Sequence, residues 1–200
     1  MNLDHLSFPD IGWGYMPPTD EVFAAFEFCE KKFRPRSVLE IGYHLGHSTT
    51  YQLEIYKRAK VVSVSPYYDN TGSVEDRVDQ LERHEMAIRL ENLYRNRWTW
   101  IPGKTYQIED ELKKKRFDFG LVDGLHSYDA CSLDLQLFVD LNIRYFLVDN
   151  FEQGAVRKAV KDNKDLRLMK VFNYSQTFKN KAKVNKMALL KLDRAQLNLL

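Results

Sequence analysis

The stretch Ser37-Val38-Leu39-Glu40-Ile41-Gly42-Tyr43-His44-Leu45-Gly46-His47-Ser48-Thr49 decides the fold class of this chain. Its apolar residues predict a short strand from about Val38 to Gly42, and the residues from Thr49 to Arg58 have the pattern of a helix. A strand, a glycine-bounded turn and a helix in this order bring backbone amides and a helix N-terminus up to a ligand. The stretch therefore indicates an α/β protein with a ligand site at this turn.

The spacing of the glycines argues against a dinucleotide. A dinucleotide fingerprint needs a glycine two positions after Gly42, where the backbone approaches a pyrophosphate, but this position is His44. Gly42 and Gly46 still allow a tight turn and close helix packing, and Glu40 adds a carboxylate at the end of the strand. A carboxylate beside this turn suits a cationic or hydroxyl-bearing ligand better than a phosphate. The alternative is an ordinary strand–helix connection without a ligand.

Length and composition predict one globular domain over residues 1–200. The chain has 200 residues with 44% hydrophobic content, enough for one well-buried core, and residues 1–19 precede the first helical pattern as an N-terminal arm. A net charge of +2 is too small to favour nucleic acid or an anionic membrane surface as a partner. Two cysteines give no disulfide framework, and no apolar run is long enough to span a membrane. We therefore expect a soluble, cytoplasmic protein.

Strand and helix patterns alternate along the chain. The strands are expected at residues 38–42, 61–65, 98–101, 117–123 and 145–149, with helical patterns before, between and after them. The last two strand patterns, at about 166–174 and 184–192, follow one another directly and are expected to be antiparallel. This order predicts a doubly wound, mostly parallel sheet with helices on both faces and a C-terminal antiparallel hairpin.

Several predicted strands end in acidic residues. Ligands of open α/β sheets bind beyond the carboxyl ends of the strands, so Glu40, Asp123 and Asp149 are expected at one edge. Asp123, Asp149 and Asn150 supply the oxygen ligands that Mg²⁺, Mn²⁺ or Ca²⁺ prefer. The alternative is that Asp123 and Asp149 cap the helices that follow them.

Three motifs in this order resemble one enzyme family. The stretch from Val38 to Ser48 is similar to the cofactor loop of class I S-adenosylmethionine-dependent methyltransferases, with the catechol O-methyltransferase type the most alike. Asp123-Gly124-Leu125-His126-Ser127-Tyr128 resembles the "DGxHxY" segment of small-molecule and sugar O-methyltransferases, and Asp149-Asn150 resembles the metal-binding end of the fifth strand. The likeness covers about residues 20 to 160. It also implies that residues 1–19, with Trp13, Tyr15 and Met16, form a lid over the site, the alternative being an arm packed on the core.

The resemblance implies a role for each matching residue. Glu40, the turn with Gly42, Tyr43 and Gly46, and Ser48 would hold the amino-acid end of S-adenosyl-L-methionine, and a side chain at Gly42 would fill the space that this cofactor needs. The other implied residues are the metal ligands Asp123, Asp149 and Asn150, with Asp123 also near the cofactor, and the catalytic base His126.

The sequence departs from the family pattern at two places. Ser65 stands where an acid normally hydrogen-bonds the cofactor ribose, and Asp69 is a candidate substitute for it. Near the adenine, Gly103 and Thr105 match the family turn, but Lys104 reverses a charge. These departures keep a methyltransferase-like binding or assembly module open as an alternative.

The function expected from these motifs is a transfer of a methyl group. S-adenosylmethionine and Mg²⁺ would serve a small-molecule acceptor, and the methyl group would go to a hydroxyl on a sugar or polyhydroxylated compound. Another reaction of the same cofactor on the same fold is the second enzyme alternative. A homodimer is left open.

Overall fold

The strands of this protein carry nearly continuous apolar runs, as a sheet buried on both faces requires. In the computed structural model, which describes residues 16–65, 74–178 and 181–193, the strand residues 38–41, 119–122 and 146–148 are all buried. The run at residues 38–41 includes one charged residue, Glu40, which has no exposed surface.

The strands described form one sheet in the order β3-β2-β1-β4-β5-β7-β6. Their bounds are β1 (Ser37–Ile41), β2 (Lys60–Ser65), β3 (Trp98–Pro102), β4 (Phe119–Val122), β5 (Tyr145–Val148), β6 (Leu166–Phe178) and β7 (Lys181–Leu192). The pairs among β1 to β5 are parallel, and β7 runs antiparallel to both β5 and β6. The strand order reverses between β1 and β4, the place where open α/β sheets bind ligands.

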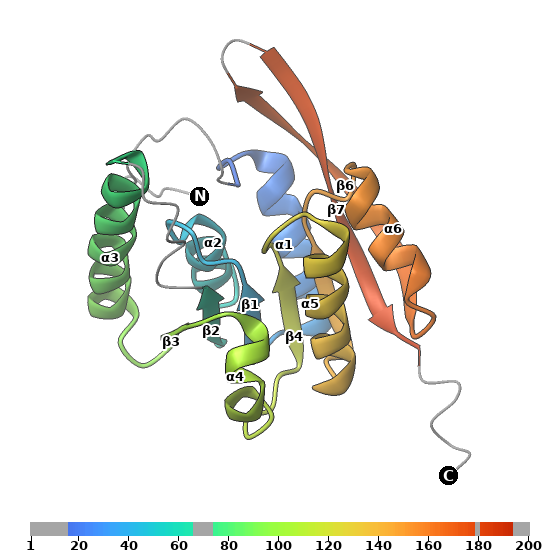
Figure 1. Ribbon diagram of the computed structural model, residues 1–200, viewed down its shortest axis with the longest axis horizontal. Helices are drawn as coiled ribbons and strands as arrows, with labels where there is room; N and C mark the ends of the chain where they lie inside the picture. The colour runs from blue at the N-terminus through green and yellow to red at the C-terminus, as the bar shows by residue number, and fades with distance from the viewer. Residues whose placement is uncertain (1–15, 66–73, 179–180, 194–200) are drawn as a thin grey trace.

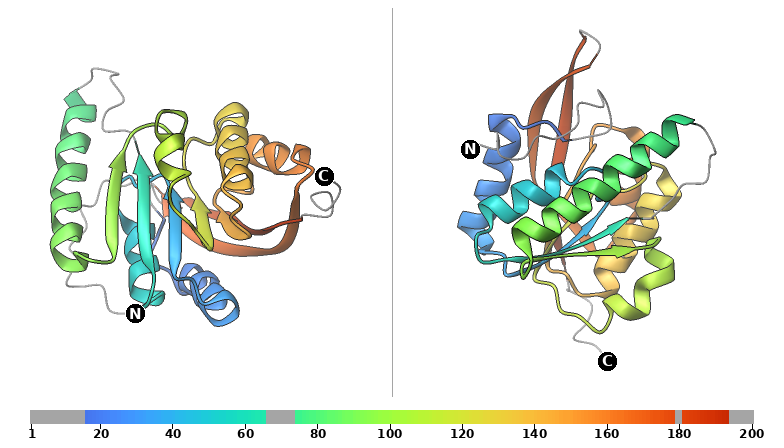
Figure 2. Two further views of the ribbon diagram at one scale, coloured as in Figure 1. Left: turned by 90° about the horizontal axis from the view of Figure 1, so that it is seen from below. Right: turned by 90° about the vertical axis from the view of Figure 1, so that its left-hand side faces the viewer.

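Helices cover both faces of the sheet (Figures 1 and 2). Their bounds are α1 (Asp20–Phe33), α2 (His47–Ile55), α3 (Val74–Tyr94), α4 (Thr105–Leu112), α5 (Tyr128–Asp140) and α6 (Gly154–Asp162). Side chains of α1, α2 and α3 belong to one apolar core cluster, and those of α4, α5 and α6 belong to a second. The sheet therefore separates two cores, which confirms the doubly wound arrangement expected from the sequence.

The C-terminal hairpin reaches past the sheet. Val148, the last residue of β5, pairs with Ala188, so the part of β7 before Ala188 continues beyond the carboxyl end of β5. Figure 1 shows β6 and β7 projecting above that edge, and the amide of Phe151 donates to the carbonyl of Lys186. The hairpin therefore forms one wall of the edge where the acidic strand ends lie.

The bounds of the strands and helices agree with those predicted from the sequence, and the largest difference is in the C-terminal hairpin. β6 and β7 are longer than the patterns at 166–174 and 184–192 indicate, with an irregularity between Leu168 and Lys170. None of the helices in the described ranges combines the length and the apolar character that crossing a bilayer requires.

Candidate active site

The parallel pairing of β1, β4 and β5 places the carboxyl ends of these three strands at one edge of the sheet. The amide of Asp123 donates to the carbonyl of Ile41 (2.8 Å), and the amide of Asp149 donates to the carbonyl of Val122 (3.0 Å). Asp123 and Asp149 therefore follow adjacent strands at the same level. Their charges interact, because Asp123 is one of the groups that raise the pKa of Asp149.

The glycine turn packs directly against the end of β4. Gly42 has a φ of +98°, and a Cβ atom there would lie 1.8 Å from the backbone oxygen of Asp123. At Gly46, with a φ of +77°, a Cβ atom would lie 2.8 Å from the ring of Tyr43. Both glycines are thus required by contacts within the protein. The fold by itself therefore requires glycine at position 42, and the role expected for Gly42 toward the cofactor stays a prediction.

The ring of Tyr43 belongs to the core. It is 1% exposed and lies 5.3 Å from Trp98 and 5.5 Å from Trp100, measured between ring centroids. Burial raises the pKa of its hydroxyl. This side chain therefore packs inside the protein, and only the backbone of Tyr43 faces the turn in the way that a cofactor loop needs.

Glu40 lies inside a network of hydrogen bonds. Its carboxylate accepts from the Ser48 hydroxyl (2.6 Å), the Gln52 amide (2.8 Å), the Ser63 hydroxyl (2.6 Å) and the Thr49 hydroxyl. Burial raises the pKa of Glu40 to about 7, although the hydroxyl groups act against this. The carboxylate ties β1 to α2 and β2, so its oxygens point to internal partners. The sequence did not predict these partners, because they depend on α2 being buried over residues 47–53, polar side chains included.

A small cavity of about 10 Å³ remains above the glycine turn. Its walls come from Met16, Gly42, Tyr43, His44, Leu45, His47, Ser48 and Asp123. The hydroxyl of Tyr51 donates to the carbonyl of Met16 (2.9 Å), which holds this residue over the turn. Burial, together with the neighbouring His44, lowers the pKa of His47 to about 3, so His47 is neutral here. A cavity of this size holds about one water molecule.

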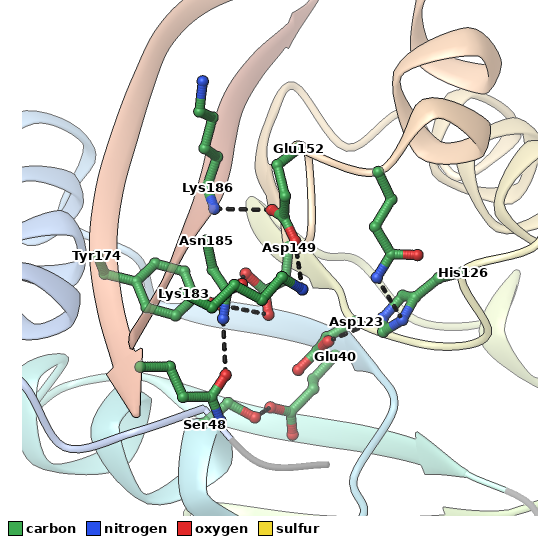
Figure 3. A network of polar contacts seen from close by, with 12 residues as sticks. Glu40, Ser48, Asp123, His126, Asp149, Glu152, Tyr174, Lys183, Asn185 and Lys186 are labelled. Atoms are coloured by element: carbon green, nitrogen blue, oxygen red, sulfur yellow. Dashed lines mark hydrogen bonds and ion pairs between the residues drawn. The ribbon is translucent and has the colours of Figure 1, made fainter. Parts of the chain in front are cut away.

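Asp123 and His126 form a pair at this edge (Figure 3). The Nε2 atom of His126 lies 3.6 Å from Oδ1 of Asp123, and its Nδ1 atom lies 3.4 Å from the side-chain nitrogen of Gln153. Burial raises the pKa of Asp123, while the contact with His126 acts in the opposite direction. The side chain of His126 is 36% exposed, so its ring can be reached from outside.

Asp149 is held by a residue from the hairpin. The hydroxyl of Tyr174 on β6 lies 2.8 Å and 3.0 Å from the two carboxylate oxygens of Asp149, which is 5% exposed. Burial raises the pKa of Asp149 well above its usual value, and the charge of Asp123 raises it further. Sequence reasoning missed Tyr174 because the residue lies in a separate element far along the chain.

The helix-cap alternative for the two aspartates does not apply. The N-cap of α5 is Ser127, whose hydroxyl accepts from the amide of Ala130, and the N-cap of α6 is Gln153. Asp123 and Asp149 therefore lie before the caps and are available for another role.

The expected metal ligands do not form an open cation site. No group of three or more His, Cys, Asp or Glu side chains is placed to hold a metal ion in the part of the chain that the structure describes. Asp149 turns both oxygens to Tyr174, and Asn150, with a φ of +52°, contributes its backbone N–H to Asp149. With these contacts, Asp149 and Asn150 do not present an open ligand set to a metal ion.

The residues expected near the ribose and adenine are also close together. The amide of Gly103 donates to the carbonyl of Ser65 (3.1 Å), which joins the end of β2 to the turn after β3. The hydroxyl of Thr105 donates to Asp134 on α5 (2.9 Å), and burial raises the pKa of Asp134 to about 6. Asp69, the candidate substitute for the missing acid, lies outside the described residues.

A polar rim links the hairpin to the loop before α6. Glu152 accepts from the backbone amide of Lys186 (2.9 Å) and pairs with the ammonium group of Lys183 (3.2 Å). The next residue, Gln153, contacts His126. Figure 3 shows Glu152 next to Lys186 and Lys183 of the hairpin. No local signal in the sequence connects these residues.

Comparison with known families identifies the chain. Residues 39–144, which are more than half of its length, match a family described as a methyltransferase domain. The chain belongs to this methyltransferase family. This match confirms the family expected from the cofactor loop and the acidic motifs. None of the curated proteins matches the sequence.

Solved structures, two of the three reported below being described as methyltransferases, share the fold at low sequence identity. A Bacillus cereus O-methyltransferase in complex with SAH has a TM-score of 0.59 at 15% identity, over 94% of this chain and 86% of that one. A precorrin-6y C5,15-methyltransferase from Geobacter metallireducens GS-15 has a TM-score of 0.62 at 11% identity, over 94% and 93%. Cofactor-bound Rv0187 from MTB has a TM-score of 0.60 at 18% identity, over 95% and 85%. These similarities concern the fold.

Proposed function

We propose that this methyltransferase transfers the methyl group of S-adenosylmethionine to a hydroxyl group of a small polar molecule, with His126 as the base. The observation that carries the proposal is the Asp123–His126 pair at the strand-order reversal, beside the glycine turn. A partly exposed imidazole beside a half-buried carboxylate is suited to accept a proton. The family match and the SAH-bound B. cereus structure support the choice of cofactor.

The cofactor would bind along the edge from the glycine turn to Thr105. The turn at Gly42–Gly46 and Ser48 would face its amino-acid end, and Gly103 and Thr105 would face its adenine. The cavity over the turn is only about 10 Å³, so cofactor entry requires Met16 to move. This requirement supports the expectation that the N-terminal segment acts as a lid, although Trp13 and Tyr15 lie outside the described residues.

His126 can act through its Nδ1 atom. Because Nε2 faces the carboxylate of Asp123, the hydrogen on the neutral ring belongs on Nε2, which leaves the lone pair on Nδ1. Gln153 covers this atom at 3.4 Å and would be replaced by the hydroxyl of the acceptor. His126 then takes the hydroxyl proton at Nδ1 as the oxygen–methyl bond forms, and the carboxylate of Asp123 stabilises the imidazolium ion.

The bound cofactor supplies a methyl group on a sulfonium centre, which is already strongly electrophilic. The main tasks of the chain are therefore to place the acceptor oxygen in line and to accept its proton. The rim formed by Glu152, Gln153 and Lys183 presents charged and amide groups to the crevice. Such groups favour an acceptor with several hydroxyl groups, such as a sugar.

Several finer expectations from the sequence are not tested by the structure or the comparisons. Assistance by Mg²⁺ rests on the resemblance alone, and the contacts of Asp149 argue against an open ligand set. A cytoplasmic location and the exclusion of nucleic acid and membranes rest on composition, and a homodimer stays open. The alternative function, a binding or assembly module, would use the same fold without turnover.

Calorimetry with S-adenosylhomocysteine (SAH) and with NADH tests the cofactor. SAH at about 100 times its Kd should stabilise the protein by about 2.7 kcal/mol, whereas NADH should have no effect. Ser48→Ala should weaken SAH binding, because Ser48 lines the cavity. Ser132→Ala is the matched control, because its hydroxyl donates to the Tyr128 carbonyl within α5, away from the cavity. Binding of NADH alone would overturn the proposal, and binding of neither compound would favour the assembly module.

Methyl transfer to a panel of catechols and sugars tests the base. His126→Ala should lower the rate of transfer by about 10²- to 10⁴-fold while SAH still binds with the parent affinity. Gln136→Ala is the control, since Gln136 is an exposed side chain that bonds Asp140 on α5. Equal rates for the parent and His126→Ala would show that another group accepts the proton.

A further inference from the structure

The strongest unassigned feature lies at the opposite edge of the sheet, where the helices end and the strands begin. Two neighbouring loops there, between α1 and β1 and between α2 and β2, form a cavity of about 400 Å³. Its lining residues are Glu30, Arg34, Arg36 and Arg58. We propose that this cavity binds a phosphorylated small molecule that also carries a hydroxyl group. The proposal is independent of the methyltransferase site.

Backbone hydrogen bonds hold the two loops together. The amide of Lys60 donates to the carbonyl of Arg36 (2.9 Å), which joins one loop to the other. On the second loop, the guanidinium of Arg97 donates to the carbonyls of Leu53 (2.9 Å) and Lys57 (3.1 Å). The arginines of the cavity therefore start from fixed backbone positions, which reduces the entropy lost when a ligand binds.

Nearby acids are already engaged elsewhere. The carboxylate of Asp118 accepts from the backbone amides of Arg36 and Ser37, all at 3.1 Å. Glu54 pairs with Lys57 at 2.7 Å. Neither carboxylate neutralises a guanidinium group of the cavity.

The three arginine side chains keep their charges available. Within the described ranges, none of Arg34, Arg36 and Arg58 forms an ion pair. Three positive charges face the single carboxylate of Glu30, and the partial negative charges at the ends of α1 and α2 reduce this excess without reversing it. The planar guanidinium group binds phosphate through two parallel hydrogen bonds, so this set selects a phosphoryl group.

Arg34 occupies a position that normally belongs to glycine. It ends α1 with a φ of +52° and a ψ of +61°, and its amide donates to the carbonyl of Glu30 (3.0 Å). A side chain in this left-handed conformation costs stability, which is why glycine is preferred at such helix ends. The arginine is therefore a poor choice for the fold alone and a suitable one for a binding site.

Glu30 supplies the second half of the recognition. Its Oε2 atom is buried and accepts no hydrogen bond from any residue in the described part of the chain. Glu30 also lines the cavity beside the arginines, where its carboxylate would repel a bare phosphate but would accept a hydrogen bond from a hydroxyl group. A cavity of about 400 Å³ has the size of a small-molecule site. A sugar phosphate meets all three requirements of charge, hydroxyl group and size.

Calorimetry at constant ionic strength tests the proposal, with glucose 6-phosphate, inorganic phosphate and glucose as probes. Glucose 6-phosphate should bind more tightly than inorganic phosphate, and glucose should not bind. Arg58→Gln should weaken the binding of glucose 6-phosphate and of inorganic phosphate at least tenfold. Arg157 is an exposed arginine on α6, and Arg157→Gln should change the binding of neither probe. Equal effects of Arg58→Gln and Arg157→Gln would overturn the proposal, because they would show only general attraction of anions.

Two further variants separate binding from folding. Arg34→Gly should raise the melting temperature, because it relieves the left-handed conformation, and at the same time weaken both phosphorylated probes about tenfold. Glu30→Gln should remove the preference for glucose 6-phosphate over inorganic phosphate. Arg34→Gly with parent affinity, or binding to phosphoinositide vesicles without binding to glucose 6-phosphate, would overturn the small-molecule proposal.

Discussion

The hydroxyl of Tyr174 on β6 lies within 3.0 Å of both carboxylate oxygens of Asp149, the residue that follows β5. The charge of Asp123 also acts on Asp149, so a buried acid and a half-buried acid share one edge of the sheet, with a tyrosine as hydrogen-bond donor to Asp149. The hydrogen bond from Tyr174 favours the ionised form of Asp149, against the effect of burial. The hairpin therefore supplies a hydrogen-bond donor to the site and also forms one of its walls.

The first prediction concerns this contact. Tyr174→Phe should lower the free energy of unfolding by about 1–3 kcal/mol, because it leaves a buried carboxylate without its donor. Tyr128→Phe removes a similar bond to Asp162, which is exposed, and should have almost no effect. Urea unfolding of the two variants measures the difference. An equal decrease in the free energy of unfolding for both variants would show that the Tyr174 hydrogen bond contributes no more than an exposed one.

The same contact predicts the response to Mg²⁺. Because Asp149 turns its oxygens to Tyr174, millimolar Mg²⁺ should leave the melting temperature of the parent unchanged, both with and without SAH. A rise with Mg²⁺ that disappears in Asp149→Asn would contradict this prediction. It would establish the cation site that the family resemblance implies.

The second prediction concerns the pH dependence that Glu40 causes. Burial raises its pKa from 4.5 to about 7 in the folded protein, so the folded state holds the proton more tightly than the unfolded state between these values. The contribution of Glu40 to stability is therefore full below about pH 4.5 and falls as the pH rises to about 7, by about 3 kcal/mol. Glu40→Gln cannot titrate and should not show this loss.

Urea unfolding of both proteins across this range isolates the effect. The depressed pKa of His47 acts in the other direction, with stability lost as the pH falls below about 6.5, but it is present in both proteins and cancels in the difference. Parallel stability curves for the parent and Glu40→Gln would show that Glu40 ionises normally in the folded protein.

The third prediction compares two glycines. Gly42→Ala should destabilise the protein by more than about 3 kcal/mol, because its Cβ atom would lie 1.8 Å from the Asp123 carbonyl oxygen. Gly154→Ala at the start of α6 meets no atom within 4 Å and should stabilise the protein by about 0.4–1 kcal/mol. Circular dichroism during urea unfolding measures both changes. A Gly42→Ala protein that folds normally but fails to bind SAH would show that the cofactor is the reason for this glycine.

The fourth prediction concerns Met16 above the glycine turn. Tyr51→Phe removes the hydrogen bond to the Met16 carbonyl, so this residue should leave the cavity more easily and SAH should associate several-fold faster. Stopped-flow mixing measures the rate. Tyr145→Phe is the control, because Tyr145 lies on β5 and stacks on Phe33 away from the cavity. Unchanged association in Tyr51→Phe would mean that Met16 does not limit entry.

Local sequence patterns carried much of the fold. The apolar runs at 38–41 and 119–122 were sufficient to predict strands, because a sheet buried on both faces leaves no alternative for such segments. The motif Asp123-Gly124-Leu125-His126 placed an acid and an imidazole three residues apart at a strand end, and the structure brings them within 3.6 Å. Residues three positions apart at a strand end stay close together whatever the tertiary packing, so the sequence alone can predict such a pair.

Contacts between distant segments were decided by the tertiary structure alone. Glu40 reads as a residue at the mouth of the site, yet α2 and β2 enclose it, because their hydroxyl and amide groups satisfy its oxygens better than an open crevice would. Tyr174 is 25 residues from Asp149, and its reach depends on how far the hairpin passes the sheet. Arg34 and Arg58 each follow a different helix in the sequence. They line one cavity only because the two loops lie side by side in the fold. Sequence determines which side chains can form a site, while packing between segments decides which of them meet.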